Sequence, residues 1–133
     1  MIVNDPATHA EVCAQFAAYE QALVTNDVAA LDGFFAASEY VIRYGGGENL
    51  YGHAAIQAFR AQRPGVGLER TLERTCIVTY GRDFAIASTL FRRASAPGKV
   101  GRQMQTWARL PEGWRVVAAH VSLIDAPDLK AGG

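Results

Sequence analysis

The sequence predicts a single α+β domain in which three helices cover the concave face of a curved, cone-shaped antiparallel sheet. Hydrophobic residues recur at helical spacing in the first third of the chain. The second half changes to β-rich segments separated by short turns, so that neighbouring strands pair as hairpins. A chain of 133 residues is long enough for one domain with one hydrophobic core.

The helices are predicted from capping signals and apolar stripes. Thr8 followed three residues later by Glu11 forms a capping box, and apolar residues then recur every three or four positions. Asn26-Asp27 interrupts this pattern and caps a short second helix, and Pro64-Gly65 ends a third. We expect helices at about 8–25, from Asp27 to near Ala37, and from Gly52 to Pro64.

The strands are predicted from β-type runs between turn signals. A short hairpin is expected to turn at Gly45-Gly46-Gly47, and four longer strands follow the third helix. We expect the long strands at Leu68 to Tyr80, Phe84 to Ala94, Val100 to Leu110 and Trp114 to Ile124. The domain then has its core at 8–125 and a loose tail at 126–133. The open end of such a cone is a natural pocket for a small ligand.

Composition excludes several classes of protein. The formal net charge is +0, and duplex binding rests on excess cationic charge, so we expect no nucleic-acid partner. The first residues lack the basic and apolar regions of a signal peptide, and no run approaches the ~20 apolar residues of a membrane span. Cys13 and Cys76 are far apart and outside any CxxC motif, which favours reduced thiols in the cytoplasm.

Metal and cofactor motifs are also missing from the sequence. The three histidines are scattered, and no HxH, HExxH or CxxC spacing occurs. The triple glycine lies in a predicted hairpin, whereas a dinucleotide site needs a glycine-rich turn between a strand and a helix. We therefore expect a protein without metal or cofactor.

Arg43 is the first candidate for a functional residue. It is the only basic residue in the first 59, which hold seven acids, and alternation places it on the same strand face as Val41. A buried, unpaired guanidinium is costly, so Arg43 either pairs with an acid such as Glu48 or Glu20, or binds an anionic ligand through its planar fork.

Tyr19 is the second candidate. It follows the apolar stripe of the first helix, so its hydroxyl needs a partner inside the protein. It is either a core tyrosine with a satisfied hydroxyl or a general acid–base. In the second case a nearby Arg43 would lower a phenol pKa that starts near ~10.

The last two strands supply further candidates for binding a substrate. Strict alternation places His120 and Ser122 on one face of the last strand, which is expected to line the cone. The other face holds Val117, Val121 and Leu123 and is either a dimer interface or part of the core. His120 is either a structural histidine or a pocket donor. Ser122 lacks a GxSxG context, so it is not expected to be a nucleophile.

Gln105 and Trp107 share one face of the preceding strand. Gln105 either binds a urea or amide carbonyl or belongs to a sheet network, and Trp107 is either a pocket wall or core. Arg74 and Arg102 are candidates for a second cation in the pocket, although strand arginines on an outer face are usually solvated.

The order of elements resembles the nuclear-transport-factor-2-like (SnoaL-like, cystatin-like) cone fold. The run from Thr106-Trp107 through Gly113-Trp114-Arg115 to His120-Val121-Ser122 is similar to the ending common in that fold. Further motifs resemble the AtzH-like family of oxalurate and cyanuric-acid catabolism. They are Tyr19-Glu20-Gln21-Ala22-Leu23, the run from Ile42 to Gly52, Phe59-Arg60-Ala61-Gln62-Arg63 and Gly101-Arg102-Gln103.

The resemblance implies a homodimer of small cones, a functional link to an amidase-signature hydrolase, and Tyr19 with Arg43 as the active pair. It favours a cofactor-free, amidase-type hydrolase of a small N-carboxylated urea-type anion, for example 1,3-dicarboxyurea converted to allophanate. One alternative is a non-catalytic small-acid-binding partner of an amidase. Another is a ketosteroid-isomerase-like isomerase or cyclase, which usually needs a carboxylate base. A fold alone does not decide among these functions.

Overall fold

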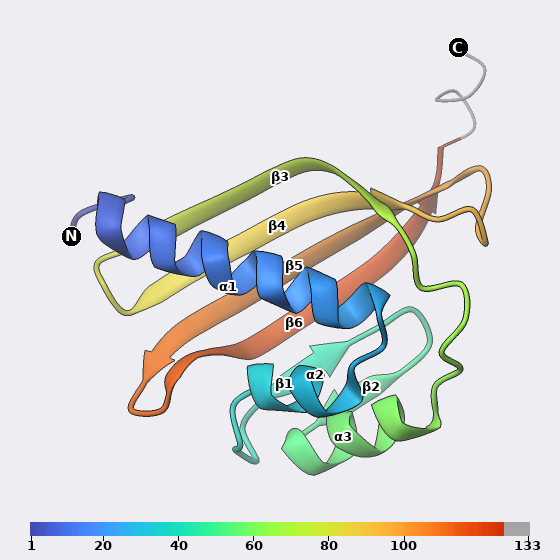
Figure 1. The fold of residues 1–133 in the computed structure, drawn as a ribbon, viewed down its shortest axis with the longest axis horizontal. Helices are drawn as coiled ribbons and strands as arrows, with labels where there is room; N and C mark the ends of the chain where they lie inside the picture. The colour runs from blue at the N-terminus through green and yellow to red at the C-terminus, as the bar shows by residue number, and fades with distance from the viewer. Residues whose placement is uncertain (127–133) are drawn as a thin grey trace.

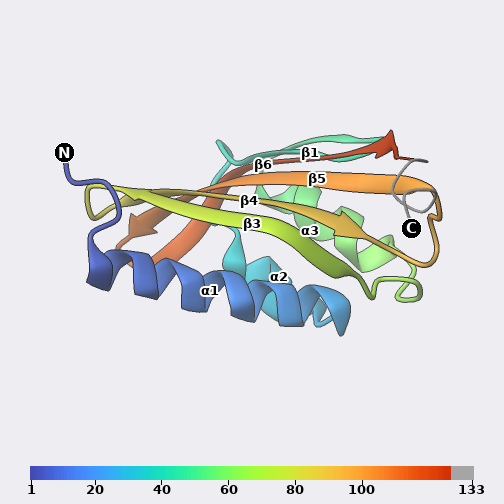
Figure 2. The same cartoon turned by 90° about the horizontal axis from the view of Figure 1, so that it is seen from above.

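The protein, described here by a computed structural model, is built around one twisted sheet with helices on its concave side (Figure 1). The structure describes residues 1–126. The helices are α1 (Pro6–Val24), α2 (Val28–Phe34) and α3 (His53–Gln62). The strands are β1 (Ile42–Tyr44), β2 (Asn49–Tyr51), β3 (Thr71–Tyr80), β4 (Phe84–Arg92), β5 (Lys99–Leu110) and β6 (Gly113–Asp125). Seen from above, α1 and α2 lie together beneath the sheet (Figure 2).

The sheet has six strands in the order β2-β1-β6-β5-β4-β3. Strands β3 to β6 form the predicted antiparallel meander. The short β1–β2 hairpin is also antiparallel, but β1 joins β6 in parallel, with Arg43 opposite Ala119. The predicted α+β cone is therefore confirmed, with one parallel pair that the alternation of apolar residues did not indicate.

Helix α1 begins two residues earlier than predicted, because Asp5 rather than Thr8 is its N-cap. The Asp5 carboxylate accepts hydrogen bonds from the backbone N–H of Thr8 at 3.1 Å and from its hydroxyl at 2.8 Å. Glu11 does not close a capping box. It accepts a hydrogen bond from Trp114 Nε1 at 2.9 Å and pairs with Arg109 at 2.8 Å, so it ties α1 to the sheet.

The core lies between α1, α2 and the concave face of the sheet. Trp107 is fully buried, and its Nε1 donates to Gln105 Oε1 at 3.1 Å. The Trp107 ring stands edge-on to those of Tyr19 and Phe34, with centroids 6.3 Å and 6.1 Å away. These aromatic contacts hold the ring of Tyr19 in place on one side.

A β-bulge in the β5–β6 pair reverses the predicted faces of the last strand. Thr106 pairs with Ala118 but Trp107 pairs with Val116, so Val117 is an extra residue. Beyond it, Ala119 is buried opposite Gln105, whereas His120 is exposed opposite Met104. The prediction that His120 and Ser122 line the cone is therefore wrong, because one inserted residue shifts the alternation by one position.

The same bulge changes the expected apolar face. Val117 packs against the core, and Val121 pairs with Gln103, whose side chain is buried on the concave side. Leu123 lies opposite Gly101 and lines a cavity with it. Of the two alternatives for this set, the structure bears out the core for Val117 and places Val121 and Leu123 on the concave side, away from the outer face. The outer face is apolar through other residues, among them Ile42, Ile86 and Met104.

Two backbone features complete the domain. Gly52 precedes α3 at φ 89°, a conformation that favours glycine, and lets the chain turn from β2 into the helix. Ala126, predicted as the start of a loose tail, is buried, and its N–H donates to Gly98 O at 2.9 Å. The rest of the predicted tail, 127–133, lies outside the described residues. Within 1–126, every helix is too short or too polar to cross a membrane.

Candidate functional site

The hydroxyl of Tyr19 lies at the centre of a buried cluster of arginines. Tyr19 is 4% exposed, and its hydroxyl accepts a hydrogen bond from Arg60 NH2 at 3.2 Å. The rings of Phe34, Phe35 and Trp107 surround the Tyr19 ring. Tyr19 therefore has an apolar ring environment and a cationic environment at its oxygen.

Arg60 is the direct partner of Tyr19, and it is buried without a carboxylate. Its side chain comes from α3, is 1% exposed, and places the guanidinium 5.2 Å from the centroid of Phe35. The Nε and NH1 atoms of Arg60 are buried and have no hydrogen-bond partner. A guanidinium normally satisfies its donors when it is buried, so Arg60 has two donors available to a ligand.

Arg63 presents the same feature directly after α3, where it is the C-cap residue. Its Nε and NH2 atoms are buried without a partner, although the residue as a whole is half-buried. Burial, followed by the charges of Arg60 and Arg43, lowers the pKa of Arg63 to about 10. Several positive charges thus face one another across this part of the interior without an acid between them.

Arg43 belongs to the same cluster, but its guanidinium already forms an ion pair with an acid. It is 9% exposed, as alternation predicted, and its NH1 donates to Glu48 Oε2 at 2.7 Å. Glu48 belongs to the β1–β2 hairpin, and the guanidinium of Arg43 also lies 5.4 Å from the Phe59 centroid. Of the two predicted roles for Arg43, the ion pair with Glu48 is present, and Arg43 also acts on Tyr19 through its charge.

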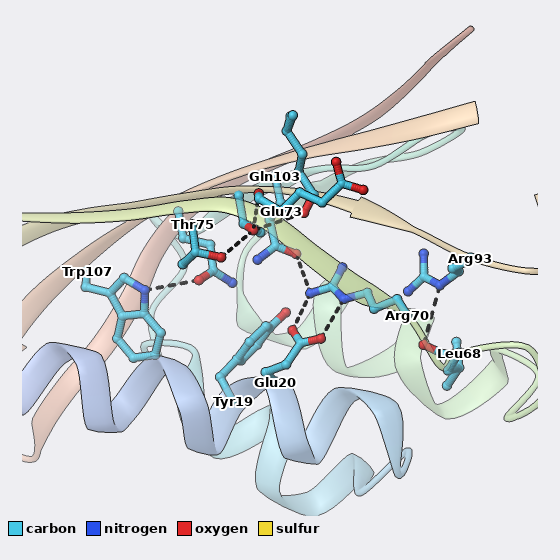
Figure 3. Close-up of polar contacts among 12 residues, drawn as sticks. Tyr19, Glu20, Leu68, Arg70, Glu73, Thr75, Arg93, Gln103 and Trp107 are labelled. Atoms are coloured by element: carbon cyan, nitrogen blue, oxygen red, sulfur yellow. Dashed lines mark hydrogen bonds and ion pairs between the residues drawn. The ribbon is translucent and has the colours of Figure 1, made fainter. Parts of the chain in front are cut away.

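Arg70 forms the best-satisfied part of the cluster (Figure 3). Its Nε and NH2 bind both carboxylate oxygens of Glu20, at 2.9 Å and 2.6 Å, in a bidentate pair. NH2 also donates to Gln103 Oε1 at 3.1 Å, and the guanidinium lies 4.5 Å from the centroid of Phe91. These bonds leave the buried Nε2 of Gln103 without a partner, so Gln103 also presents a free donor.

Arg93 packs on the same Phe91 ring as Arg70. Its guanidinium is 4.8 Å from the ring centroid, and Nε donates to Leu68 O at 3.4 Å (Figure 3). Burial and the charge of Arg70 lower the pKa of Arg93, while Glu20 and Tyr19 act in the opposite direction. Arg93 is thus within electrostatic reach of Tyr19.

The cluster carries an excess of positive charge. Among the described residues, only Glu48 and Glu20 neutralise it, through Arg43 and Arg70. The remaining three guanidiniums have no ion pair within 1–126; they belong to Arg60, Arg63 and Arg93. Buried cations without counter-charge are unfavourable, so a bound anion would offset part of their cost.

The excess charge also changes the acidity of Tyr19. Burial alone would raise its pKa, but the charges of Arg60, Arg43 and Arg70 outweigh burial, and the pKa lies below the usual value for a phenol. Arg60 contributes twice, through its charge and through its hydrogen bond to the oxygen. Tyr19 therefore gives up a proton more readily than a free tyrosine does.

The other predicted residues fall into two groups. Gln105 and Trp107 lie inside, where they bond to each other, in agreement with the face predicted for them. His120 and Ser122 lie on the outer face, where Ser122 Oγ accepts from Arg102 Nε at 3.2 Å.

Neither of the two proposed extra cations reaches the interior. Arg102 is exposed on the outer face. Arg74 is exposed at a bulge of β3, in the left-handed conformation with φ 52°.

The residues that sequence reasoning missed are arginines. Arg60 follows Ile56 by four residues, which is the spacing of the buried face of α3, so this spacing could have indicated Arg60. Arg63 is the extended C-cap residue after α3, so helical spacing does not indicate it. Arg70 and Arg93 precede and follow long strands, and no local pattern in the sequence distinguishes them from solvated arginines.

The described part of the chain has no cluster of three or more His, Cys, Asp or Glu residues that could hold a metal ion. Cys13 and Cys76 are free. The side chains around the Tyr19 hydroxyl can support proton transfer and anion binding.

Comparison with known proteins agrees with this fold. The curved sheet and its helices define the cystatin-like, nuclear-transport-factor-2-like class. Residues 1–127 match the AtzH-like family model, so the chain belongs to that family. A search of curated proteins found no match.

Three solved structures illustrate the likeness. A protein of unknown function from Pectobacterium atrosepticum is 56% identical, with a TM-score of 0.90 over 92% of this chain and 95% of that one. A cystatin-like fold protein from Burkholderia xenovorans is 48% identical, with a TM-score of 0.91 over 96% and 99%. A nuclear-transport-factor-2-like protein of unknown function from Pseudomonas putida is 18% identical, with a TM-score of 0.73 over 87% and 86%, and shows the fold alone.

Proposed function

We propose that the protein is a cofactor-free enzyme of the amidase type that removes a carboxylate from a small N-carboxylated urea-type anion. The observation that carries this proposal is the pair of free, buried donors on Arg60, beside a Tyr19 hydroxyl whose pKa is lowered. The first feature suits an anion, and the second suits a proton donor working near neutral pH.

Tyr19 supplies the proton in the proposed step. In R–NH–COO⁻ the C–N bond breaks, its electron pair goes to nitrogen, and carbon dioxide leaves. The nitrogen takes the proton of the Tyr19 hydroxyl and becomes R–NH₂, and solvent then returns a proton to the phenolate. Arg60 NH2 already donates to this oxygen at 3.2 Å, so it stabilises the phenolate as it forms.

The free donors orient the substrate. The free Nε and NH1 atoms of Arg60 each offer a donor to the anion, on different edges of the guanidinium, and Arg63 and Gln103 Nε2 offer further donors. The anion-binding role first considered for Arg43 passes to Arg60, because Glu48 holds Arg43 NH1 at 2.7 Å. Arg43 keeps an electrostatic role by lowering the pKa of Tyr19.

A non-catalytic anion-binding module would use the same free guanidinium donors, so it is the second candidate. An isomerase or cyclase with a carboxylate base has less support. The two acids of the arginine cluster, Glu20 and Glu48, are both held in ion pairs by arginines.

Turnover of allophanate by the wild type and by Tyr19→Phe tests the proposal. Allophanate is an N-carboxylated urea, so the expected products are urea and carbon dioxide. We expect Tyr19→Phe to lower kcat by at least about 100-fold, because general acid catalysis contributes about 10²–10⁴. Its thermal midpoint should remain close to that of the wild type.

Two outcomes would contradict parts of the proposal. If Tyr19→Phe keeps the wild-type rate, Tyr19 is not the proton donor. If the wild type releases no carbon dioxide above the spontaneous rate but is stabilised by malonate or oxalurate, the protein is an anion-binding module and not this enzyme.

A further inference from the structure

A cavity lies beside the turn between β4 and β5, apart from the hydroxyl of Tyr19. It has a volume of about 200 Å³, and its lining comes from the ends of β4 and β5, the turn between them and β6. The lining residues are Phe91, Arg93, Ser95, Ala96, Lys99, Gly101 and Leu123. They include two cations and no acid, so the cavity is suited to a small anion.

Phe91 is shared by this cavity and the Tyr19 site. Two guanidiniums pack on its ring: Arg70 at 4.5 Å and Arg93 at 4.8 Å from the centroid. Arg70 belongs to the Tyr19 site, where Glu20 and Gln103 hold it, whereas Arg93 lines the cavity. The cavity and the Tyr19 site therefore meet at the Phe91 ring.

Gly101 makes room for the Phe91 ring. It pairs with Phe91 across the β4–β5 ladder, and a Cβ at Gly101 would collide with the Phe91 ring. The absence of a side chain lets the buried ring lie against the sheet at this place, where the two guanidiniums pack on it.

Arg93 is held in a way that leaves it free to bind. Within the described residues its side chain forms no ion pair and one hydrogen bond, a long one to Leu68 O at 3.4 Å. Lys99 is different, because Asp125 holds its Nζ at 2.6 Å. Arg93 is therefore the uncompensated cation of the cavity, and it is close enough to Tyr19 and Glu20 to sense their charges.

We infer that this cavity is the entrance to the Tyr19 site, and that Arg93 captures the small carboxylate anion there before Arg60 and Arg63 receive it. The inference deepens the proposed function and rests on its anionic substrate. Arg93 is a specificity and capture residue rather than a catalytic one, since the proton transfer takes place at Tyr19. A charged residue in such a position raises the association rate and leaves the chemical step unchanged.

Arg93→Gln, with Arg92→Gln as the matched control, tests the electrostatic part. Arg92 is adjacent in the chain but points to the other face of β4, where it pairs with Glu73. Association of malonate is followed by tryptophan fluorescence in stopped flow, because Trp107 contacts Tyr19. We expect Arg93→Gln to slow association about tenfold at low salt and to weaken its salt dependence, with Arg92→Gln unchanged. Equal rates in the two variants would overturn the inference.

A blocking experiment tests the route. Ser95 is exposed and lines the cavity, so Ser95→Cys in a Cys13→Ala, Cys76→Ser background places one thiol at the entrance. The control is Cys13→Ala alone, labelled at the exposed native Cys76. A bulky maleimide at position 95 should slow malonate association at least tenfold, while a label at Cys76 should not. If the label at position 95 has no effect, anions reach Tyr19 another way.

The outcomes separate this inference from the proposed function. If malonate binds as described but allophanate is not turned over, the entrance stands and the catalytic proposal fails. If allophanate is turned over with the same kcat/KM in Arg93→Gln as in the wild type, the catalytic proposal stands and the entrance fails. If the wild type binds no small anion, both fail.

Discussion

The two faces of the sheet differ in a way that reverses the usual distribution of charge. The concave face encloses the Tyr19 hydroxyl among guanidiniums, three of which lack a carboxylate partner within residues 1–126. The convex face exposes apolar side chains such as Ile42 and Met104. Since buried charge costs stability, the arginines of the concave face indicate function, whereas the core aromatics beside them supply stability.

The concave face itself has two parts, one suited to stability and one suited to binding. Around Trp107 the contacts are apolar, with one internal hydrogen bond to Gln105. From Gln103 to Arg93 the side chains are polar or cationic. Substitutions around Trp107 should therefore affect folding, and substitutions among the polar and cationic side chains should affect binding.

The largest effect on stability is expected from Trp107→Ala. Trp107 is fully buried and contacts Tyr19 and Phe34, so its removal leaves a cavity and should lower the free energy of unfolding by about 3–5 kcal/mol. Chemical denaturation measures this change. Met104→Ala, on the convex face, is the control, and a loss there as large as that at Trp107 would contradict the proposed division between faces.

Arg60→Gln should have the next largest effect, and it should act in opposite directions with and without ligand. Without ligand, the variant should be at least as stable as the wild type, because it removes an uncompensated buried charge. A ligand at 100 times its Kd stabilises by about 2.7 kcal/mol, and the variant should lose this gain with malonate. Thermal unfolding with and without malonate measures both. An apo protein strongly destabilised by Arg60→Gln would show that Arg60 is structural.

A smaller effect is expected on the pH dependence of kcat/KM. Tyr19 must be protonated to act as an acid, so the rate should fall as the pH rises through its pKa, which lies below the usual ~10. Arg60→Gln removes a charge that lowers this pKa, so the alkaline limb should move to higher pH. Arg92→Gln should leave the limb in place. If the alkaline limb stays in place in Arg60→Gln, the limb does not report the ionisation of Tyr19.

The smallest effects are expected from His120→Ala and Ser122→Ala. Both side chains lie on the convex face, away from Tyr19, so each should change the free energy of unfolding by no more than about 0.5 kcal/mol. Allophanate turnover should also stay at the wild-type level. A large loss of turnover in either variant would mean that the convex face contributes to the reaction.

Much of the fold could be predicted because it depends on local patterns. Helical spacing in 8–25 and short turns between β-rich runs indicated the order of elements, and alternation correctly placed Arg43 and Trp107 inside. The faces of the last strand were predicted wrongly because Val117 is an extra residue in the β5–β6 pair. A bulge depends on pairing with the neighbouring strand, so no periodicity within one strand shows it.

The candidate site was only partly predictable for a related reason. Tyr19 was indicated by its place in the apolar stripe of α1, and its motif resembled those of the family. Arg43 was predicted to lie beside the Tyr19 hydroxyl. In the structure Arg60 donates to that hydroxyl, and Arg43 forms an ion pair with Glu48. Which arginine meets Tyr19 depends on how α3 packs beside the sheet.

The sequence by itself therefore determined the α+β architecture, the inward position of Tyr19 and Arg43, and the resemblance to the AtzH-like family. These features follow from spacing and residue type along the chain. Only the tertiary structure decided which guanidiniums are neutralised and which remain free, as it did for Arg60, Arg63 and Arg93. The physical reason is that charge compensation depends on distances of a few ångströms between residues far apart in the chain.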